Sequence, residues 1–211
     1  RILAEPAYQR LLALEPVLRR IIPGLTIFFL LVVAAARVMS LTTARDEIET
    51  SAALTLNLAT AQLASELSGT NTSKGSVDLV AADAALQLAD SLGSTQAESV
   101  LMVADPALKV IAVRGRTGGL LGKNLEAIIT DNQPLFLFGA KAGTMPVTIN
   151  GTPHLAALRF IAGSAGAVAA IQSTDAIFAD WRKTVSLNVT LFVLTSGLLL
   201  VVLYAYFSQS I

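Results

Sequence analysis

The chain of 211 residues contains no cysteine, one histidine and one tryptophan, and only 14% of its residues are charged. Because cysteine is absent, no disulfide bond can form, and an exported domain has to be held together by its core. A metal site built from His and Cys ligands is excluded for the same reason. The charges balance to a formal net charge of zero, so no excess of basic residues indicates a nucleic-acid partner.

Two long apolar runs stand near the two ends of the chain. The first covers residues 21–41 and includes Arg37, whose long side chain lets its charge reach the headgroups; the second covers residues 185–207 and carries no charge. Each is long enough to cross a bilayer, which takes roughly 20 apolar residues. The alternatives are a buried core helix for either run and a cleaved signal peptide for the first.

The charges around the first run predict the orientation in a membrane. Four arginines precede it, namely Arg1, Arg10, Arg19 and Arg20. Lys and Arg accumulate on the cytoplasmic side of membrane helices. The sequence therefore predicts a two-pass membrane protein with a cytoplasmic lead over residues 1–20. Residues 42–184 would then form one domain outside the cytoplasm, and residues 208–211 would begin a further cytoplasmic part. The lead itself is either an amphipathic segment on the membrane surface or a poorly ordered tail.

A helix is predicted over residues 42–67, directly after the first apolar run. Its apolar residues recur at steps of three and four, which places them on one face. This spacing is also typical of a parallel helix dimer, and it predicts a homodimer with this seam: Ile48, Ala52, Leu56, Ala59, Leu63 and Leu67. The alternative is that the same face packs only on the chain's own domain.

The remainder of the domain predicts a second helix and then mainly strands. Ser76 is a suitable N-cap for the second helix, with Val77, Val80, Ala84 and Leu88 pointing inward. Strands are expected over residues 99–104 and 109–113, with Asp105 and Pro106 between them in a tight turn. Asn124 is expected to cap a short helix. Residues 134–138 are apolar and predict either a strand or a buried loop.

The last part of the domain predicts three antiparallel strands and an exit helix. Asn150 and Gly151 are the residue pair most suited to a type I′ turn, and they separate strands at 145–149 and 153–161. A strand at 167–171 follows, and a helix from Asp175 runs into the second apolar run. The predicted fold is α+β, with an antiparallel sheet of about five strands, a long N-terminal helix and two flanking transmembrane helices.

Two stretches resemble the Cache or PDC sensor domains, which are relatives of the PAS fold and lie outside the membrane in bacterial signalling proteins. One runs from Val103 through the Asp105 turn to Val113 and on to Gly119-Leu-Leu-Gly-Lys-Asn-Leu125; the other is the Asn150-Gly151 hairpin with residues 165–173. The family tends to place glycine in the turn where this chain has Ala107 and Leu108. The alanine-rich composition most resembles that of the N-terminal sensor regions of alphaproteobacterial sensor histidine kinases, PleC-like proteins among them.

The resemblance implies a ligand site against the sheet, under the loop and short helix after the second strand. Arg159 lies in an otherwise apolar strand, and its planar guanidinium suits a small carboxylate. The matching polar positions are Arg114, Arg116, His154 and Arg159, with Phe136, Phe138 and Met145 as walls. The alternative is that these polar residues face solvent. No cofactor or metal site is expected.

No nucleophile, phosphate loop or paired carboxylates indicate catalysis within this segment. The resemblance implies the sensing and transmembrane-signalling region of a two-component sensor histidine kinase. The alternatives are the same front end on a chemoreceptor or a diguanylate cyclase, and a structural or partner-binding membrane protein without a ligand pocket. A sheet face filled by side chains, with Arg159 pointing outward, is the feature expected of the last alternative. For a sensor domain, the resemblance implies a bacterial inner membrane with residues 42–184 in the periplasm, and a small carboxylate or a periplasmic or membrane partner protein as the stimulus.

Overall fold

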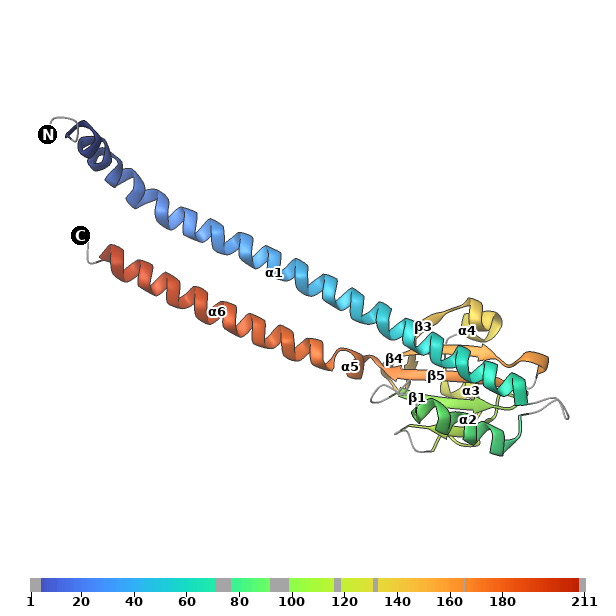
Figure 1. Ribbon diagram of the computed structural model, residues 1–211. Helices are drawn as coiled ribbons and strands as arrows, with labels where there is room; N and C mark the ends of the chain where they lie inside the picture. Colours follow the sequence, from blue (N-terminus) through green and yellow to red (C-terminus); the bar gives the residue numbers. More distant parts are fainter. Residues whose placement is uncertain are drawn as a thin grey trace. The chain divides into compact units, whose positions relative to one another are not determined.

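The computed structural model describes residues 5–70, 77–91, 99–115, 119–130, 133–164 and 166–208 (Figure 1). The chain divides into two compact units, and each is described by itself. One comprises residues 46–180 and contains the sheet. The other comprises residues 1–45 and 181–211 and contains the two apolar helical segments. The helix α1 (Glu5–Thr70) runs without interruption and contributes to both.

The first unit is an α+β domain, as the sequence predicts. Its sheet has five strands, all pairs are antiparallel, and the order is β2-β1-β5-β4-β3. The strands are β1 (Ser99–Ala104), β2 (Val110–Arg114), β3 (Thr144–Ile149), β4 (Thr152–Phe160) and β5 (Ala167–Ser173). The helices around them are α2 (Leu79–Ser91), α3 (Leu125–Ile128), α4 (Gln133–Phe138) and α5 (Thr174–Ile177), with 3₁₀ turns η1 (Gly139–Lys141) and η2 (Ala162–Ser164).

The last strand in the sequence, β5, is the central strand of the sheet. It pairs with β1 on one side and β4 on the other, so Ala170 lies opposite both Leu101 and Ala157. Ala167 through Ile171 are all buried. A strand covered on both faces reads as an apolar run rather than an alternating one. Small alanine side chains let helices approach closely on each side.

Each face of the sheet carries its own hydrophobic core. On one face, residues of α1 and α2 pack against inward side chains of the strands, among them Leu101, Val103 and Val168. On the other face, α3, α4 and the segment before α3 pack against Met102, Leu158 and Ala169. The sheet is therefore enclosed between two helical layers, of which α1 is the longest element.

The predicted turns are confirmed at the residues that the sequence singles out. Asn150 and Gly151 have φ angles of 50° and 79°, as a type I′ hairpin turn requires. The turn from β4 to β5 depends on Gly166, which has a φ of 142°. A Cβ atom at Gly166 would overlap the carbonyl group of Ala104, so a side chain there would push β5 away from the end of β1.

Two local predictions are wrong. Residues 134–138 form neither a strand nor a loop but most of α4, because Pro134 occupies the first turn, where its missing N–H costs nothing. In α2 the face that packs inward holds Ala82 and Leu86, whereas Val80 and Leu88 are exposed. The helix is apolar on almost every side, so its periodicity could not define the inward face.

The second unit contains two helical segments that are long and apolar enough to cross a membrane. They lie in α1, from Ile21 onward, and in α6 (Ala179–Ser208). Large apolar side chains on both are exposed over most of their surface, for example Phe28, Phe29, Leu194 and Leu198. Apolar side chains exposed on most sides of a helix of this length are typical of a membrane span. Both predicted apolar helices are confirmed.

A pair of leucines on α1 tests how the domain is held together. Leu63 is 1% exposed in the core and Leu58 is 69% exposed on the same helix. We expect Leu63→Ala to lower the free energy of unfolding of residues 42–184 by about 2–5 kcal/mol. The matched change Leu58→Ala should cost less than about 0.5 kcal/mol. Urea titration followed by circular dichroism measures both, and equal effects would contradict the described packing of α1.

Candidate functional site

The loop between β1 and β2 is closed by the side chain of Asp105. Its Oδ1 accepts hydrogen bonds from the amides of Ala107 and Lys109 at 2.9 and 2.8 Å, and its carbonyl accepts from the amide of Leu108 at 2.9 Å. Leu108 has a φ of 60°, a left-handed conformation that costs a side-chain-bearing residue roughly 1–2 kcal/mol. Glycine, which lacks a Cβ atom, adopts this conformation more easily.

The segment after β2 is fastened to that turn and forms a cover over the sheet. Asn124 caps α3, as predicted, by accepting a hydrogen bond from the amide of Glu126 at 2.8 Å. The amide of Leu125 donates to the carbonyl of Leu108 at 2.8 Å, and the amide of Val110 donates to the carbonyl of Lys123. The loop and short helix thus lie where the resemblance implies the roof of a ligand site.

Side chains from the described part of this roof pack on the sheet. Leu125, Ile129 and Leu135 are almost completely buried and belong to the same core as Met102 and Leu158 of the sheet. Phe136 and Met145, two predicted pocket walls, are partly buried against this core. Phe138, the third, is 60% exposed. Phe136 and Met145 therefore contribute to packing, and Phe138 to the surface.

Arg159 points to the opposite face of the sheet. It lies on the same face of β4 as Leu155 and Ala157, which pack in the core beneath α1 and α2. Its Nη2 donates to Oδ1 of Asn57 on α1 at 3.3 Å, while its Nε is enclosed and has no hydrogen-bond partner among the described residues. The arginine thus joins the sheet to α1, together with Thr144, whose hydroxyl donates to the carbonyl of Ala53 at 2.9 Å.

Arg114 and His154 are not brought together with Arg159. Arg114 lies on β2 opposite Leu101, and therefore on the same face as Arg159, but β1 and β5 lie between their strands. Strands are about 4.8 Å apart, so this separation is roughly 14 Å. His154 lies on the other face, together with Ala156 and Leu158. Its Nδ1 is 2.9 Å from the carbonyl oxygen of Thr152. Arg116 lies outside the described residues.

The predicted dimer seam lies largely inside the chain's own domain. Ala52, Leu56, Ala59, Leu63 and Leu67 are all buried in the core beneath α1, and Ile48 is partly exposed. The structure therefore shows the alternative, packing on the chain's own sheet, for five of the six residues. Leu54 and Leu58, on another side of α1, are exposed.

In the unit of apolar helices, Trp181 joins α6 to α1. Its indole Nε1 donates to the carbonyl of Leu41 at 3.1 Å, and the guanidinium of Arg45 lies 5.9 Å from the ring centroid. Tryptophan is enriched where membrane helices leave the hydrocarbon. The contact lies at the end of residues 21–41 on α1 and just before residues 185–207 on α6, so it joins corresponding ends of the two apolar segments. The sequence places Trp181 on the exit helix but carries no signal for its partner, because the two positions are far apart in the chain.

No protein-family model matches the chain, and no curated protein is detectably similar to it in sequence. Among the residues that the structure describes, no three His, Asp or Glu side chains are grouped so that they could hold a metal ion. The functional assignment therefore depends on the arrangement of the chain's own residues.

The contact between Arg159 and Asn57 predicts a measurable energetic coupling. We expect Asn57→Ala to destabilise residues 42–184 by about 1 kcal/mol, because the guanidinium then lacks its described partner. In an Arg159→Met background, which keeps the apolar stem and removes the charge, the same change should cost almost nothing. Urea unfolding of the unmodified domain, the two single variants and the double variant gives the coupling energy. Lys123→Met replaces a cation on the surface in place of Arg159 and serves as the control. Additive effects would show that the two residues do not interact.

Proposed function

We propose that this chain is the extracytoplasmic sensing and transmembrane-signalling region of a bacterial sensor histidine kinase, with a Cache/PDC-like domain related to the PAS fold. The observation that carries the proposal is that both ends of the sheet domain continue directly into the candidate membrane helices. Apolar residues from Ile21 onward and the core residues Leu56 and Leu63 belong to the one helix α1. At the other end, β5 is followed at once by α5 and then by α6.

The order of elements supports the resemblance to that family. The domain has a strand, an aspartate-closed turn, a second strand, a glycine-containing loop and a short capped helix, in the order that the resemblance implies. The Asn150-Gly151 hairpin then leads through β5 into the exit helix. The left-handed Leu108 supports the resemblance further, because it keeps a conformation that glycine adopts most easily.

A change in how α1 packs on the sheet is the proposed signal. The buried side of α1 contacts the core around β5, and β5 leads into α6, so altered packing reaches both candidate membrane helices. A stimulus acts only to the extent that it binds two such states unequally. A typical coupling between two sites is worth about 1–3 kcal/mol. The kinase itself belongs to the proposal through the resemblance alone.

The packed α3–α4 face favours a protein partner as the stimulus over a small carboxylate held under α3. A small molecule there would have to displace Leu125, Ile129 or Leu135, which are almost fully buried. A partner can instead bind exposed surface. The homodimer that the sequence predicts would use the exposed side of α1 around Leu54 and Leu58, because the predicted seam is occupied by the chain's own sheet.

The orientation is testable because the chain has no cysteine of its own. We expect Glu126→Cys, on the exposed first turn of α3, to react with a membrane-impermeant maleimide in intact spheroplasts. Ser208→Cys, at the exposed end of α6, should react only after permeabilisation. The unmodified chain is the control. Equal labelling of both positions without permeabilisation, or the reverse pattern, would contradict a two-pass protein with its domain outside.

A thermal-shift screen separates the two kinds of stimulus. For residues 42–184 we expect small carboxylates at millimolar concentration to change Tm by less than about 1 °C, because a ligand stabilises only a fold that has room for it. A concentration-dependent increase in Tm that is lost in Arg159→Met would contradict this and assign a carboxylate site to Arg159. Arg159→Met alone, measured without ligand, controls for its own effect on Tm.

A further inference from the structure

One helix of the sheet domain is apolar on both of its sides. In α2, all residues over 79–88 except Asp83 and Gln87 are Leu, Val or Ala. Ala82 and Leu86 are completely buried and pack in the core that α2 shares with α1. A helix that is apolar all round is normally covered on all sides. The side of α2 that faces away from the core is therefore a candidate interaction surface.

This outward side carries a row of three exposed apolar residues, Val80, Ala84 and Leu88, which we call the α2 stripe. They follow one another at steps of four, so they lie in line along the helix. Val80 is 73% exposed and Leu88 is 46% exposed. With a rise of 1.5 Å per residue the row is about 12 Å long, which corresponds to roughly two turns of a second helix. The small side chain of Ala84 at its centre lets another backbone approach closely.

Carboxylates border the α2 stripe, and the helix contains no basic residue. Asp83 is three residues after Val80 and is therefore its neighbour on the helix surface. Its Oδ2 accepts a hydrogen bond from Nε2 of Gln87 at 2.8 Å, which holds the carboxylate alongside the stripe. Asp78 is exposed just before the helix begins. Neither carboxylate forms an ion pair with another described residue. The surface is thus apolar with a negative border.

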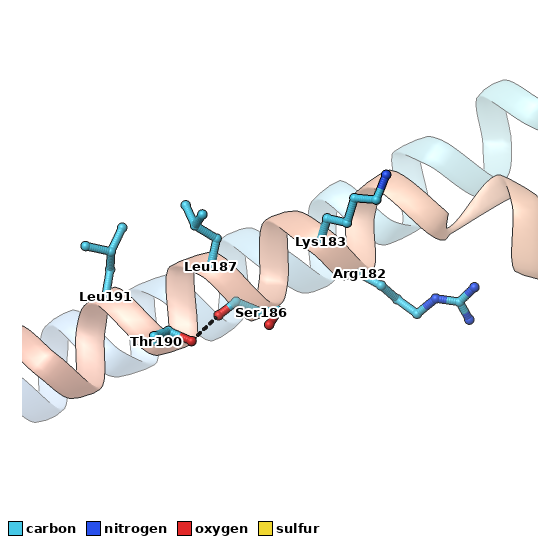
Figure 2. A pocket seen from close by; sticks show the side chains of 6 residues that line it. All are labelled: Arg182, Lys183, Ser186, Leu187, Thr190 and Leu191. Carbon is cyan, nitrogen blue, oxygen red and sulfur yellow. Dashed lines mark hydrogen bonds between the residues drawn. The ribbon is translucent and has the colours of Figure 1, made fainter.

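The sign of this border argues against a lipid bilayer as the cover. On α6, the exposed Leu187 and Leu191 follow Arg182 and Lys183 along the helix (Figure 2), and long basic side chains are usual near the ends of membrane helices. Helices that lie on a membrane surface likewise carry Lys and Arg on their polar side. The α2 stripe has carboxylates instead, which anionic lipids repel. With 13 residues, α2 is also too short to span a bilayer.

The same border argues against a second copy of the α2 stripe as the cover. A two-fold symmetric contact brings the same surface of both chains together. Asp83 of one chain would then lie near the negative border of the other, and the juxtaposition of like charges opposes such a contact. A suitable cover therefore combines an apolar row with positive charge beside it.

We propose that the α2 stripe binds a basic amphipathic helix of a partner protein. Apolar side chains of that helix pack beside Val80 and Leu88, and its Lys or Arg residues reach Asp83. A helix fits better than a strand, because a strand needs free backbone groups to bond with, and the middle turns of α2 bond their own. The inference goes beyond the proposed function, since binding at α2 requires neither a kinase nor a particular orientation in the membrane.

A selection tests the chemistry of the partner without assuming its identity. The full chain is held in phosphatidylcholine nanodiscs, and a phage library of helical peptides with randomised surface positions is first depleted on empty nanodiscs. We expect the selected peptides to carry Leu, Ile or Phe at steps of three and four, with Lys or Arg beside them. Selected peptides that are neutral or acidic around their apolar row would overturn the proposal, as would the absence of any enrichment.

Fluorescence anisotropy of the strongest selected peptide then identifies its binding site. We expect Val80→Ser/Leu88→Ser to weaken binding about tenfold or more, because two apolar contacts are lost. Asp83→Asn should weaken it about threefold at low salt and less at high salt. Leu137→Ser and Glu47→Gln change an exposed apolar residue and an exposed carboxylate elsewhere, and should leave the affinity unchanged. If the stripe variants bind like the unmodified chain, α2 is not the site.

Two further measurements exclude other covers of the α2 stripe. Val80→Ser/Leu88→Ser should change Tm by less than about 3 °C, because both side chains are exposed; a large decrease would show that the chain itself covers them. Self-association in sedimentation that is lost in Asp83→Asn would assign the stripe to another surface of a second copy. Either result would contradict a partner helix. A reversed cysteine-labelling pattern would instead remove the proposed function and leave peptide binding unaffected.

Discussion

The burial of one side of α1 against the sheet is the interaction on which the domain depends. The central strand of the sheet is rich in alanine, and its small side chains leave room that Leu56, Leu63 and Leu67 of α1 help to fill. Polar contacts at Ala53 and Asn57 fix the helix along its axis. Since the same helix continues as an apolar segment, the packing that holds the domain together is also its connection to a membrane.

Much of the fold follows from local chemistry and is therefore readable from the sequence. The Asp105 turn and the Asn124 cap are made by side chains that bind backbone groups close to them in the chain, and the Asn150-Gly151 hairpin is made by two residues that adopt positive φ easily. The inward face of α2 was not readable, because Ala and Leu side chains project from most sides of that helix. The side of the sheet on which Arg159 lies was not readable for a related reason: strand alternation groups residues by face, but only the tertiary structure showed that the face of Arg159 is the one beneath α1.

The membrane-facing unit carries a different kind of information. Hydropathy identifies both apolar segments, because a bilayer imposes a length and a composition on any helix that crosses it. Hydropathy does not say which residues of the two segments lie side by side. The hydrogen bond from Trp181 to Leu41 does, and it brings aromatic and cationic side chains together at one end of both segments.

The central place of β5 has a consequence for how the chain is made. Neither β1 with β2 nor β3 with β4 can form a complete sheet until β5 is inserted between them. Proteins are synthesised from the N-terminus, and pairing between distant segments forms slowly. The domain therefore remains open until nearly all of its sequence has been translated, and α6 follows β5 after only the short α5. Completion of the fold and delivery of the second apolar helix to the insertion machinery thus fall in the same short interval of biosynthesis.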